Sequence, residues 1–324
     1  MTDVITIHVH QHGETNRAPR IDPAWLAPTS DVTLWVDLAA PAPEDGRVLS
    51  EVFQFHPLSV EDALSAIHHP KIEAYPGYLY LILHGIDLKR RKREFATHDV
   101  DFFLGRNYLV TVHDGGSRSI AKWRDLCDRH EHVLAEGPAA LLHRIVDSMV
   151  QNYRPEVEAL EDQIDELEKS AVLGRRPNLI RQILAAKRDL ASLRRVVVPQ
   201  RDAVGRLGRR EFPQISDEMT YRFRDVYDQF VRLSEEAILF QDRVTSILEA
   251  HLTTVSNRLN VVMKVLTVIS TIFLPLTVLT GMWGMNVPLP MFPGGAAAQF
   301  WWVGAVMAAV VVVMLALFRM TKWI

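Results

Sequence analysis

The sequence predicts an α+β membrane protein. An N-terminal α/β domain precedes a long helical stalk, and the stalk continues into the first of two C-terminal transmembrane helices. Three observations predict this architecture. Roughly the first 115 residues contain short runs of alternating apolar residues, which are typical of strands, and helical periodicity follows them. Between Lys264 and Arg319 there is no charged residue, a run of 54 positions in a chain of which 23% is charged.

The charge distribution separates a soluble part from a membrane part. The chain has 39 acidic and 36 basic residues, and no Asp or Glu occurs after Glu249. The part before Lys264 therefore carries a net charge of −6, although the whole chain carries −3. This pattern excludes a purely soluble enzyme and also a polybasic nucleic-acid-binding protein. We therefore expect no nucleic-acid partner.

The cysteine content and the N-terminus indicate the compartment of the soluble part. Cys127 is the single cysteine, which excludes an intramolecular disulfide and a multi-cysteine zinc site. The N-terminus lacks a basic segment followed by an apolar one, so we expect no signal peptide. The soluble part is therefore predicted to stay in the cytoplasm.

Residues 1–117 are predicted to form a cytosolic α/β domain. Alternation is clear over 32–38, 78–83 and 108–112. Turn signals such as Pro76-Gly77 separate these runs. Mixed strands and short helices favour a layered α/β fold.

Residues 118–211 are predicted to form a cytosolic helical hairpin. Amphipathic spacing runs over 139–170 and 177–204, with a break at Leu173-Gly174. The acid-rich run 156–168 is more typical of a solvated helix face than of a metal site.

Residues 212–283 are predicted to form a stalk helix that runs into the first transmembrane helix. Ser216 and Asp217 suit a helix N-terminus. No Pro or Gly then occurs until Pro275. One helix of roughly 65–70 residues, on the order of 100 Å long, is expected. A coiled-coil-like apolar seam steps along it through Val244, Leu248, Leu252, Val255, Leu259 and Val262. So narrow a helix needs partners, which favours an oligomer.

Two apolar stretches predict the membrane spans. Residues 265–283 and 300–318 each contain 19 residues, enough to cross a hydrocarbon core of ~30 Å. The predicted outer loop, 284–299, holds three prolines, three glycines and no Lys or Arg. Basic residues flank the other ends of both spans, so both termini are predicted to be cytoplasmic, with residues 300–324 forming the second span and a basic tail.

The first span has one face of small and hydroxylated residues. They recur at intervals of three and four, as one helix face requires: Thr267, Ser270, Leu274, Thr277 and Gly281. One interpretation is close packing between helices. The other is a pore lining without fixed charge, which requires an oligomer because two spans cannot enclose a pore.

At the outer end of this span stands Gly284-Met285-Asn286, which resembles the signature of the CorA family of divalent-cation transporters. Its context strengthens the resemblance, because a long stalk helix, MKVLTVISTIFLPLTVLTGMWGMN at 263–286, a short loop, one further span and a basic aromatic tail stand in this order. The cytosolic segments HPLSVEDAL at 56–64 and FFLGRNYLVTVHD at 102–114 are also similar to this family, within a CorA/ZntB-like superfamily. The resemblance covers nearly the whole chain.

The resemblance implies a funnel-shaped homopentamer whose first spans line a pore for divalent cations. The ion is expected to be Mg²⁺, with Co²⁺ or Ni²⁺ also passing. By the resemblance, Gly284, Met285 and Asn286 form the selectivity motif at the mouth. An ungapped alignment from that motif places further residues on the conduction path, namely Asn260, Leu266, Ser270, Leu274, Thr277 and Gly281. Leu266 and Leu274 would be hydrophobic constrictions able to gate by dewetting.

The family also implies cytosolic divalent sites between subunits. The same alignment places Asp225 at the stalk position of such a site, and Asp87 is the candidate partner in the α/β domain. The alternative is that Asp225 pairs with Arg222 or Arg232 on the helix surface. No cofactor is expected beyond the divalent cation itself, as cargo and as regulator.

Two departures from the family pattern bear on the ion. Residues 287–299 contain no acid, although many magnesium-type members have one soon after the motif. The tail at 319–324 has fewer basic residues than is common in the family. Transport of Zn²⁺, as in the zinc branch of the superfamily, is therefore the alternative. In a different class of function, the hairpin would only anchor a cytosolic binding module. An enzyme is not expected, because the sequence shows no nucleotide loop, nucleophile-and-base set or hydrolase motif.

Three histidines alternate near the N-terminus. On one strand, His8, His10 and His12 would share a face at roughly 6.6–6.8 Å spacing. Zinc or nickel binding is one interpretation, and exposed polar residues without a metal are the other.

Overall fold

The computed structural model describes residues 4–27, 29–65, 69–86, 97–129, 132–173, 178–285, 295–321 and 323. The chain forms two compact units, Met1–Leu248 and Glu249–Ile324. The helix α5, Asp217–Trp283, contributes to both of them. Each unit is therefore described by itself.

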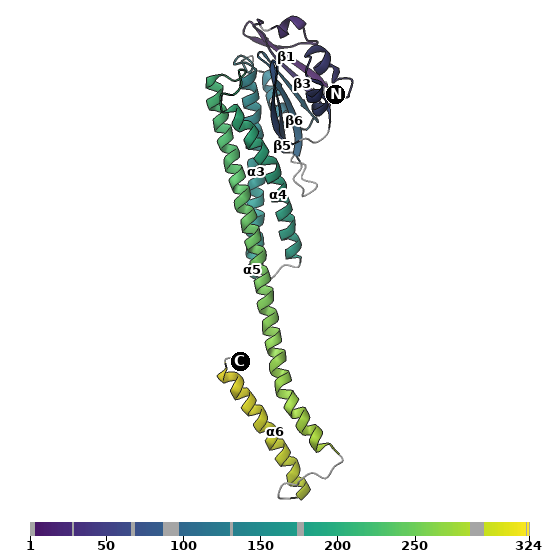
Figure 1. Ribbon diagram of the computed structural model, residues 1–324, viewed down its shortest axis with the longest axis vertical. Helices are drawn as coiled ribbons and strands as arrows, with labels where there is room; N and C mark the ends of the chain where they lie inside the picture. The colour runs from purple at the N-terminus through teal and green to yellow at the C-terminus, as the bar shows by residue number, and fades with distance from the viewer. Residues whose placement is uncertain are drawn as a thin grey trace. The chain divides into compact units, whose positions relative to one another are not determined.

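A seven-stranded mixed sheet forms the N-terminal part of the first unit (Figure 1). Its spatial order is β2-β1-β3-β7-β6-β5-β4, in which only β3 and β7 pair in parallel. The strands are β1 Ile5–Gln11, β2 Glu14–Arg17, β3 Thr33–Ala39, β4 Lys71–Tyr75, β5 Tyr78–Ile86, β6 Thr97–Leu104 and β7 Tyr108–His113. The three alternating runs in the sequence fall on β3, β5 and β7.

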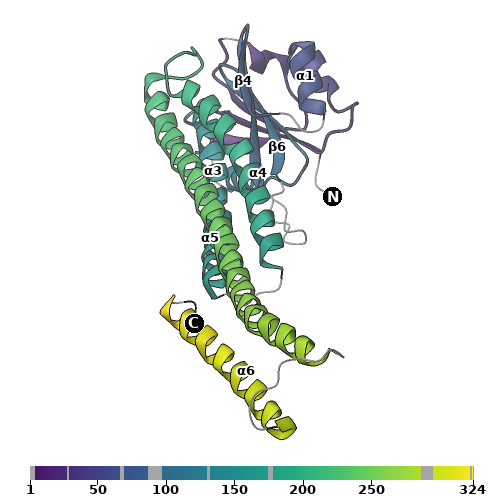
Figure 2. The same cartoon turned by 60° about the horizontal axis from the view of Figure 1, so that its bottom comes forward.

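The two faces of the sheet carry separate apolar cores. One face packs against the short helix α1, Pro57–Leu64, and Phe55 and Phe103 stack there with ring centroids 4.3 Å apart. The other face packs against α2, Arg118–Cys127, and against the long helices α3, Pro138–Leu173, and α4, Leu179–Leu207. Figure 2 shows α1 on one side of the sheet and α3 and α4 on the other. Strand alternation sends one set of side chains to each core.

A buried hydrogen-bonded clip joins the hairpin helices to the sheet. β4 pairs with β5 only as far as Ile82, so the backbone of His84 lacks a strand neighbour on that side. The side chain of Gln200, on α4, accepts from His84 N (2.9 Å) and donates to Tyr153 Oη (2.9 Å). Tyr153, on α3, donates to His84 O (2.8 Å). Gln200 and Tyr153 are fully buried, so this clip satisfies polar groups that would be costly to leave unpaired.

The edge strand β4 is partly covered by a side chain. Arg206 of α4 donates from Nη1 to Ile72 O at 2.8 Å. An open strand edge is a template for unwanted pairing with another chain, and a cationic side chain across it blocks that pairing.

Asp101 is a buried acid on the α1 side of the sheet. It is 5% exposed and accepts a hydrogen bond of 2.5 Å from the hydroxyl of Tyr80. Burial raises the pKa of Asp101 from 3.8 to about 8. The folded protein therefore holds a proton on Asp101 at pH values at which the unfolded chain has lost it.

We expect Asp101→Asn to stabilise the protein at pH 8. Between the unfolded pKa near 4 and the folded pKa near 8, the native state binds more protons, so stability falls as pH rises. Asn resembles the protonated acid and removes this dependence, for a gain on the order of 1–3 kcal/mol at pH 8. Thermal denaturation of the full chain in detergent at pH 5.5 and pH 8 measures it. Exposed Asp114→Asn serves as the control, and an unchanged pH slope in Asp101→Asn would contradict the expectation.

The helical part of the first unit matches the expected hairpin closely. α3 and α4 extend the predicted ranges by one to three residues at most of their ends, whereas α4 begins at Leu179, two residues late. α5 begins at Asp217, with Asp217 and Glu218 in its first turn. Its apolar residues as far as Val244 and Ile247 are buried in the same core as α3 and α4.

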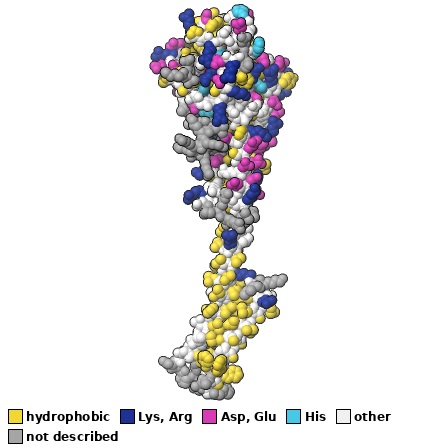
Figure 3. All heavy atoms as spheres, turned by 180° about the vertical axis from the view of Figure 1, so that it is seen from behind, with side chains coloured by type: hydrophobic (Ala, Val, Ile, Leu, Met, Phe, Trp, Pro, Cys, Tyr) yellow, Lys and Arg dark blue, Asp and Glu magenta, His cyan; other side chains and the backbone are white. Residues whose placement is uncertain are grey.

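The second unit contains the remainder of α5 and the helix α6, Gly295–Met320. Both helices contain a window long and apolar enough to cross a membrane, and neither window is buried. α5 has 67 residues, within the length expected from the sequence. The seam residues beyond Leu248 are exposed, since Leu252 is 52% and Leu259 is 60% accessible. Figure 3 shows hydrophobic side chains crowding the C-terminal helices, while charged side chains gather on the first unit.

Candidate functional site

The face of α5 that the sequence singles out is open to its surroundings. Leu266 is 56% exposed and Leu274 is 71% exposed. At 100° per residue, the positions of Leu266, Ser270, Leu274, Thr277 and Gly281 fall within an arc of about 80°. Asn260 lies about 40° beyond that arc and is also exposed. Within one chain, the described residues offer this face no packing partner.

The hydroxyl groups on this helix have a fixed direction. Thr277 Oγ1 donates to Phe273 O (2.9 Å), and Thr267 Oγ1 donates to Met263 O (2.8 Å). Each hydroxyl hydrogen is therefore committed to the helix backbone, and the oxygen keeps its lone pairs as an acceptor. Such oxygens suit a cation or the water molecules around it, and they suit an anion poorly.

The glycine on this face is not crowded by other atoms of the chain. A Cβ added to Gly281 would meet nothing within 4 Å. Gly281 is therefore not needed for close packing within the chain, and its surroundings are free for another copy or for solvent.

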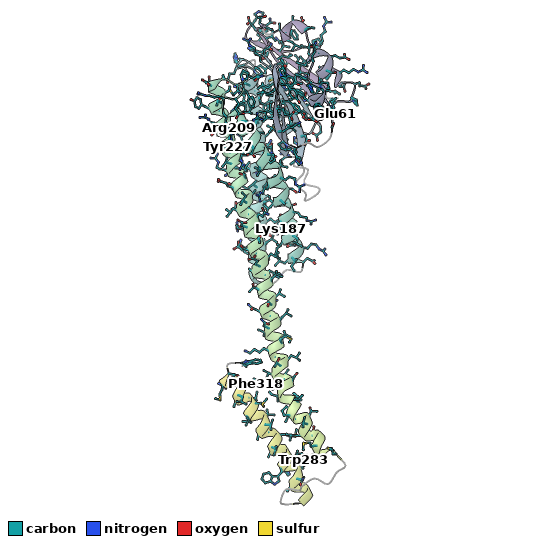
Figure 4. The ribbon with its side chains drawn as sticks, in the orientation of Figure 1. Glu61, Lys187, Arg209, Tyr227, Trp283 and Phe318 are labelled. Atoms are coloured by element: carbon teal, nitrogen blue, oxygen red, sulfur yellow. The ribbon has the colours of Figure 1, made fainter. Side chains whose placement is uncertain are left out.

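The signature motif begins where α5 ends. The helix ends at Trp283, marked in Figure 4, and Gly284 N still donates to Thr280 O at 2.9 Å. Met285 is 58% exposed. Asn286, the polar member of the motif, lies outside the described residues.

Asp225, the predicted stalk acid, lies on the exposed side of α5 in the first unit. Its Oδ2 accepts from Gln229 Nε2 at 3.3 Å, and the same amide nitrogen donates to Asp147 Oδ1 at 3.0 Å. Gln151 Nε2 donates to the other oxygen of Asp147 (2.7 Å). One amide group thus bridges two carboxylates that belong to α3 and α5.

Arg222, offered by the sequence as a surface partner for Asp225, has other partners. Its guanidinium bonds Glu136 at 2.7 Å and Glu218 at 2.7 Å. These bonds raise the pKa of Arg222 and lower that of Glu136. Among the described ion pairs, none includes Asp225. This leaves its carboxylate with a neutral amide as its neighbour.

Asp147 is the residue that sequence reasoning missed. It stands on α3 between apolar and polar residues and belongs to no recognisable motif. Only the packing of α3 against α5 brings it to Asp225. Asp87, the expected partner in the α/β domain, lies outside the described residues. Within the described parts of the chain, no group of three or more His, Cys, Asp and Glu could hold a metal ion.

The prediction that the three N-terminal histidines share one strand face is wrong for His12. β1 ends at Gln11, and His12 and Gly13 form a tight turn with φ of 54° and 88°. His8 is 1% exposed, and its Nε2 lies 2.9 Å from Asp128 Oδ1. Its pKa is lowered by burial. His10 bonds Thr15 at 2.9 Å. His8 and His10 thus serve the fold, each with a partner inside the domain.

The chain is similar to known proteins over most of its length. The sequence model of the family described as "CorA-like Mg2+ transporter protein" matches residues 30–320. The chain is 33% identical over 252 residues to the putative metal ion transporter YfjQ of Bacillus subtilis, over 78% of both proteins. It is 30% identical over 281 residues to the cobalt/magnesium transport protein CorA of Thermotoga maritima, over 85% of this chain and 79% of the relative.

A solved structure shows the same fold. The complete structure of the CorA magnesium transporter from Methanocaldococcus jannaschii aligns over 100% of both chains, with a TM-score of 0.83 at 22% sequence identity. The α/β layer, the long helices and the two apolar C-terminal helices therefore occur in this order in both proteins.

Proposed function

The chain belongs to the CorA-like Mg²⁺ transporter family, a family of membrane transporters for divalent cations, and from this premise we propose that it conducts Mg²⁺, and also Co²⁺ or Ni²⁺, through a homopentameric pore. One observation carries the proposal. The face of α5 that holds Ser270, Thr277 and Gly281 has no fixed charge, is exposed within one chain and presents acceptor oxygens. Five such faces around an axis would form a neutral, oxygen-lined path.

A neutral path suits the chemistry of Mg²⁺. This ion loses its water reluctantly, so a pore that stripped the hydration shell would face a high barrier. Oxygen atoms that only accept hydrogen bonds stabilise the bound water instead, because water around a cation points its hydrogens outward. Asn286 at the mouth and Thr277 within the pore would act in this way. Rings of Leu266 and Leu274 would close the path when it dewets.

The proposed topology follows the charge distribution of the tail and stalk. Basic residues flank the cytoplasmic ends of both spans, and the loop between them has none. The protein would then cross the cell (inner) membrane twice, with both termini in the cytoplasm.

Flux measurements test the function directly. Purified full-length protein in liposomes should admit Mg²⁺ down its gradient, and the same preparation is assayed with Co²⁺ and Zn²⁺, with and without a proton gradient. Faster Zn²⁺ flux that depends on protons would favour the zinc transporter. A complete lack of flux for every ion would favour a membrane-anchored binding module.

We expect Asn286→Ala to abolish flux while folding and assembly remain intact. Asn286 is the polar side chain of the motif, and alanine cannot hydrogen-bond the water around the ion. Proteoliposome flux measures the effect, and gel filtration in detergent checks assembly. Flux at the wild-type level in this variant would contradict the proposed role of the motif.

We expect Thr277→Ala to lower flux less severely. A water molecule can replace the missing hydroxyl oxygen, at a cost of about 1 kcal/mol or roughly fivefold in rate. Thr271→Ala is the matched control, because Thr271 has the same backbone hydrogen bond (to Thr267 O, 2.7 Å) but points about 120° away from Thr277 around the helix. Equal losses in both variants would mean that the hydroxyl groups act only in helix packing.

We also propose that Asp225 and Asp147 hold a regulatory divalent cation together with an acid from the neighbouring subunit, for which Asp87 is the candidate. The bridging amide of Gln229 occupies the position between the two carboxylates and would move aside for the ion. The part before Lys264 carries −6 in each chain, and hence −30 in five. Bound cations would reduce this repulsion and stabilise the closed assembly.

Under this proposal Asp225→Asn should weaken protection of the cytosolic part by Mg²⁺, and Asp147→Asn should do the same. Limited proteolysis over a Mg²⁺ titration gives the midpoint of protection, which we expect to rise about tenfold with the loss of one carboxylate. Asp125→Asn on α2 is the control. Superimposable curves for wild type and both variants would mean that these acids are ordinary surface residues.

A further inference from the structure

Three arginines form a stripe along α4. Arg181, Arg188 and Arg195 stand seven residues apart and are all exposed. Seven residues are two helical turns, so the three side chains leave the helix on one side at intervals of about 10.5 Å. Among the described ion pairs, none joins any of the three to an acid. We call these residues the basic stripe.

Three acids form a stripe of the same repeat along α5. Asp228, Glu235 and Asp242 also stand seven residues apart, and all are exposed. The ion pairs of the described residues include none of them. We call these residues the acidic stripe. It begins three residues after Asp225, so it continues the side of α5 on which the proposed regulatory acid lies.

Exposed apolar side chains stand beside both stripes. Leu184, 46% exposed, lies between Arg181 and Arg188 on α4, and Leu239, 57% exposed, lies between Glu235 and Asp242 on α5. A shallow groove of about 370 Å³ lies beside Arg195, at one end of the basic stripe, and is lined by Ala191, Arg194, Arg195, Val198, Pro199 and Gln241. An apolar stripe flanked by charges is the pattern that helices use to pair with another helix.

We propose that the basic stripe of one copy docks onto the acidic stripe of the next copy in the ring. The inference rests on the proposed function, because it assumes that the copies form a closed ring. A ring of identical subunits is built from heterologous contacts, in which one face meets a different face of its neighbour. α4 and α5 run in opposite directions in the fold (Figure 1), so the two stripes would meet as an antiparallel helix pair.

Within one chain, α4 and α5 do not meet through the two stripes. α4 meets α5 through other residues, because Arg194 bonds Gln241 at 3.3 Å and Gly205 lies against the ring of Tyr227. Lys187, which Figure 4 marks on α4, precedes Arg188 and adds to the positive charge. An anionic lipid surface would attract the basic stripe, but it would leave the equal repeat of acids on α5 without a role. The matched spacing favours a second copy as the partner.

Charge reversal tests the pairing. Antiparallel pairing of the two stripes sets Arg188 opposite Glu235 and Arg195 opposite Asp228. One variant of the full chain therefore carries Arg188→Glu and Arg195→Glu, and a second carries Asp228→Lys and Glu235→Lys. Each should place like charges opposite one another and raise the protein concentration needed for assembly about tenfold or more. The four substitutions combined restore opposite charges and should restore assembly. Arg47→Glu with Arg106→Glu, both exposed in the α/β domain, is the matched control. Assembly is measured by cross-linking and gel filtration in detergent.

A cysteine experiment covers the case in which a reversed variant fails to fold. A chain with Arg188→Cys is co-expressed with a chain that carries Glu235→Cys and a different tag. Oxidation should join the two different chains. It should not join two Arg188→Cys chains expressed alone, because α4 meets α5 and not another α4.

The outcomes separate this inference from the proposed function. Rings that conduct ions and assemble normally in both reversed variants would overturn the pairing of the stripes and leave the transporter intact. Loss of assembly in the control variant, or failure of the combined variant to recover, would also overturn it. A wild-type chain that is monomeric and conducts nothing would overturn the inference together with the proposed function.

Discussion

The rest of this structure depends on the unbroken hydrogen-bond ladder of α5. A helix in hydrocarbon must satisfy its backbone internally, and one in water gains most of its stability by burying an apolar face. α5 meets both demands along 67 residues, first against α3 and α4 and then as an apolar helix. Between these regimes lie Leu252 and Leu259, apolar and exposed. In the proposed assembly, neighbouring copies would bury these side chains, and the stability of one chain would then depend on its assembly.

Much of the fold could be predicted from the sequence, because periodicity reports which face of an element is buried. β3, β5 and β7 were visible as alternating runs, and the start of α5 was visible from Ser216 and Asp217. β1 was harder to read, because His8 and His10 interrupt its apolar pattern with polar residues that find partners only in the folded domain. Asp128, the partner of His8, lies 120 residues away. The sequence carries no local signal of such a contact.

Part of the candidate site could likewise be predicted from the sequence, and part could not. The exposed face of α5 follows from spacing alone, since position on a helix determines direction. The proximity of Asp147 and Asp225 depends on the packing of two helices, and no regular spacing links residues on different elements. A related difficulty affects Asp101, whose raised pKa comes from burial beneath α1. From the sequence alone, an acid in a strand is predicted to be exposed, and only the tertiary structure shows that it is buried.

The direction of the threonine hydroxyls has a consequence for protons. Proton hopping along a row of hydroxyl groups requires each group to release one hydrogen and turn to accept the next. Thr267 and Thr277 each give their hydrogen to a carbonyl of the preceding turn. Turning would break that bond at every step. A wall built this way can orient water around a cation, but it forms no proton wire of its own. In the proposed pore, any proton that accompanied the metal would therefore have to travel through the water column.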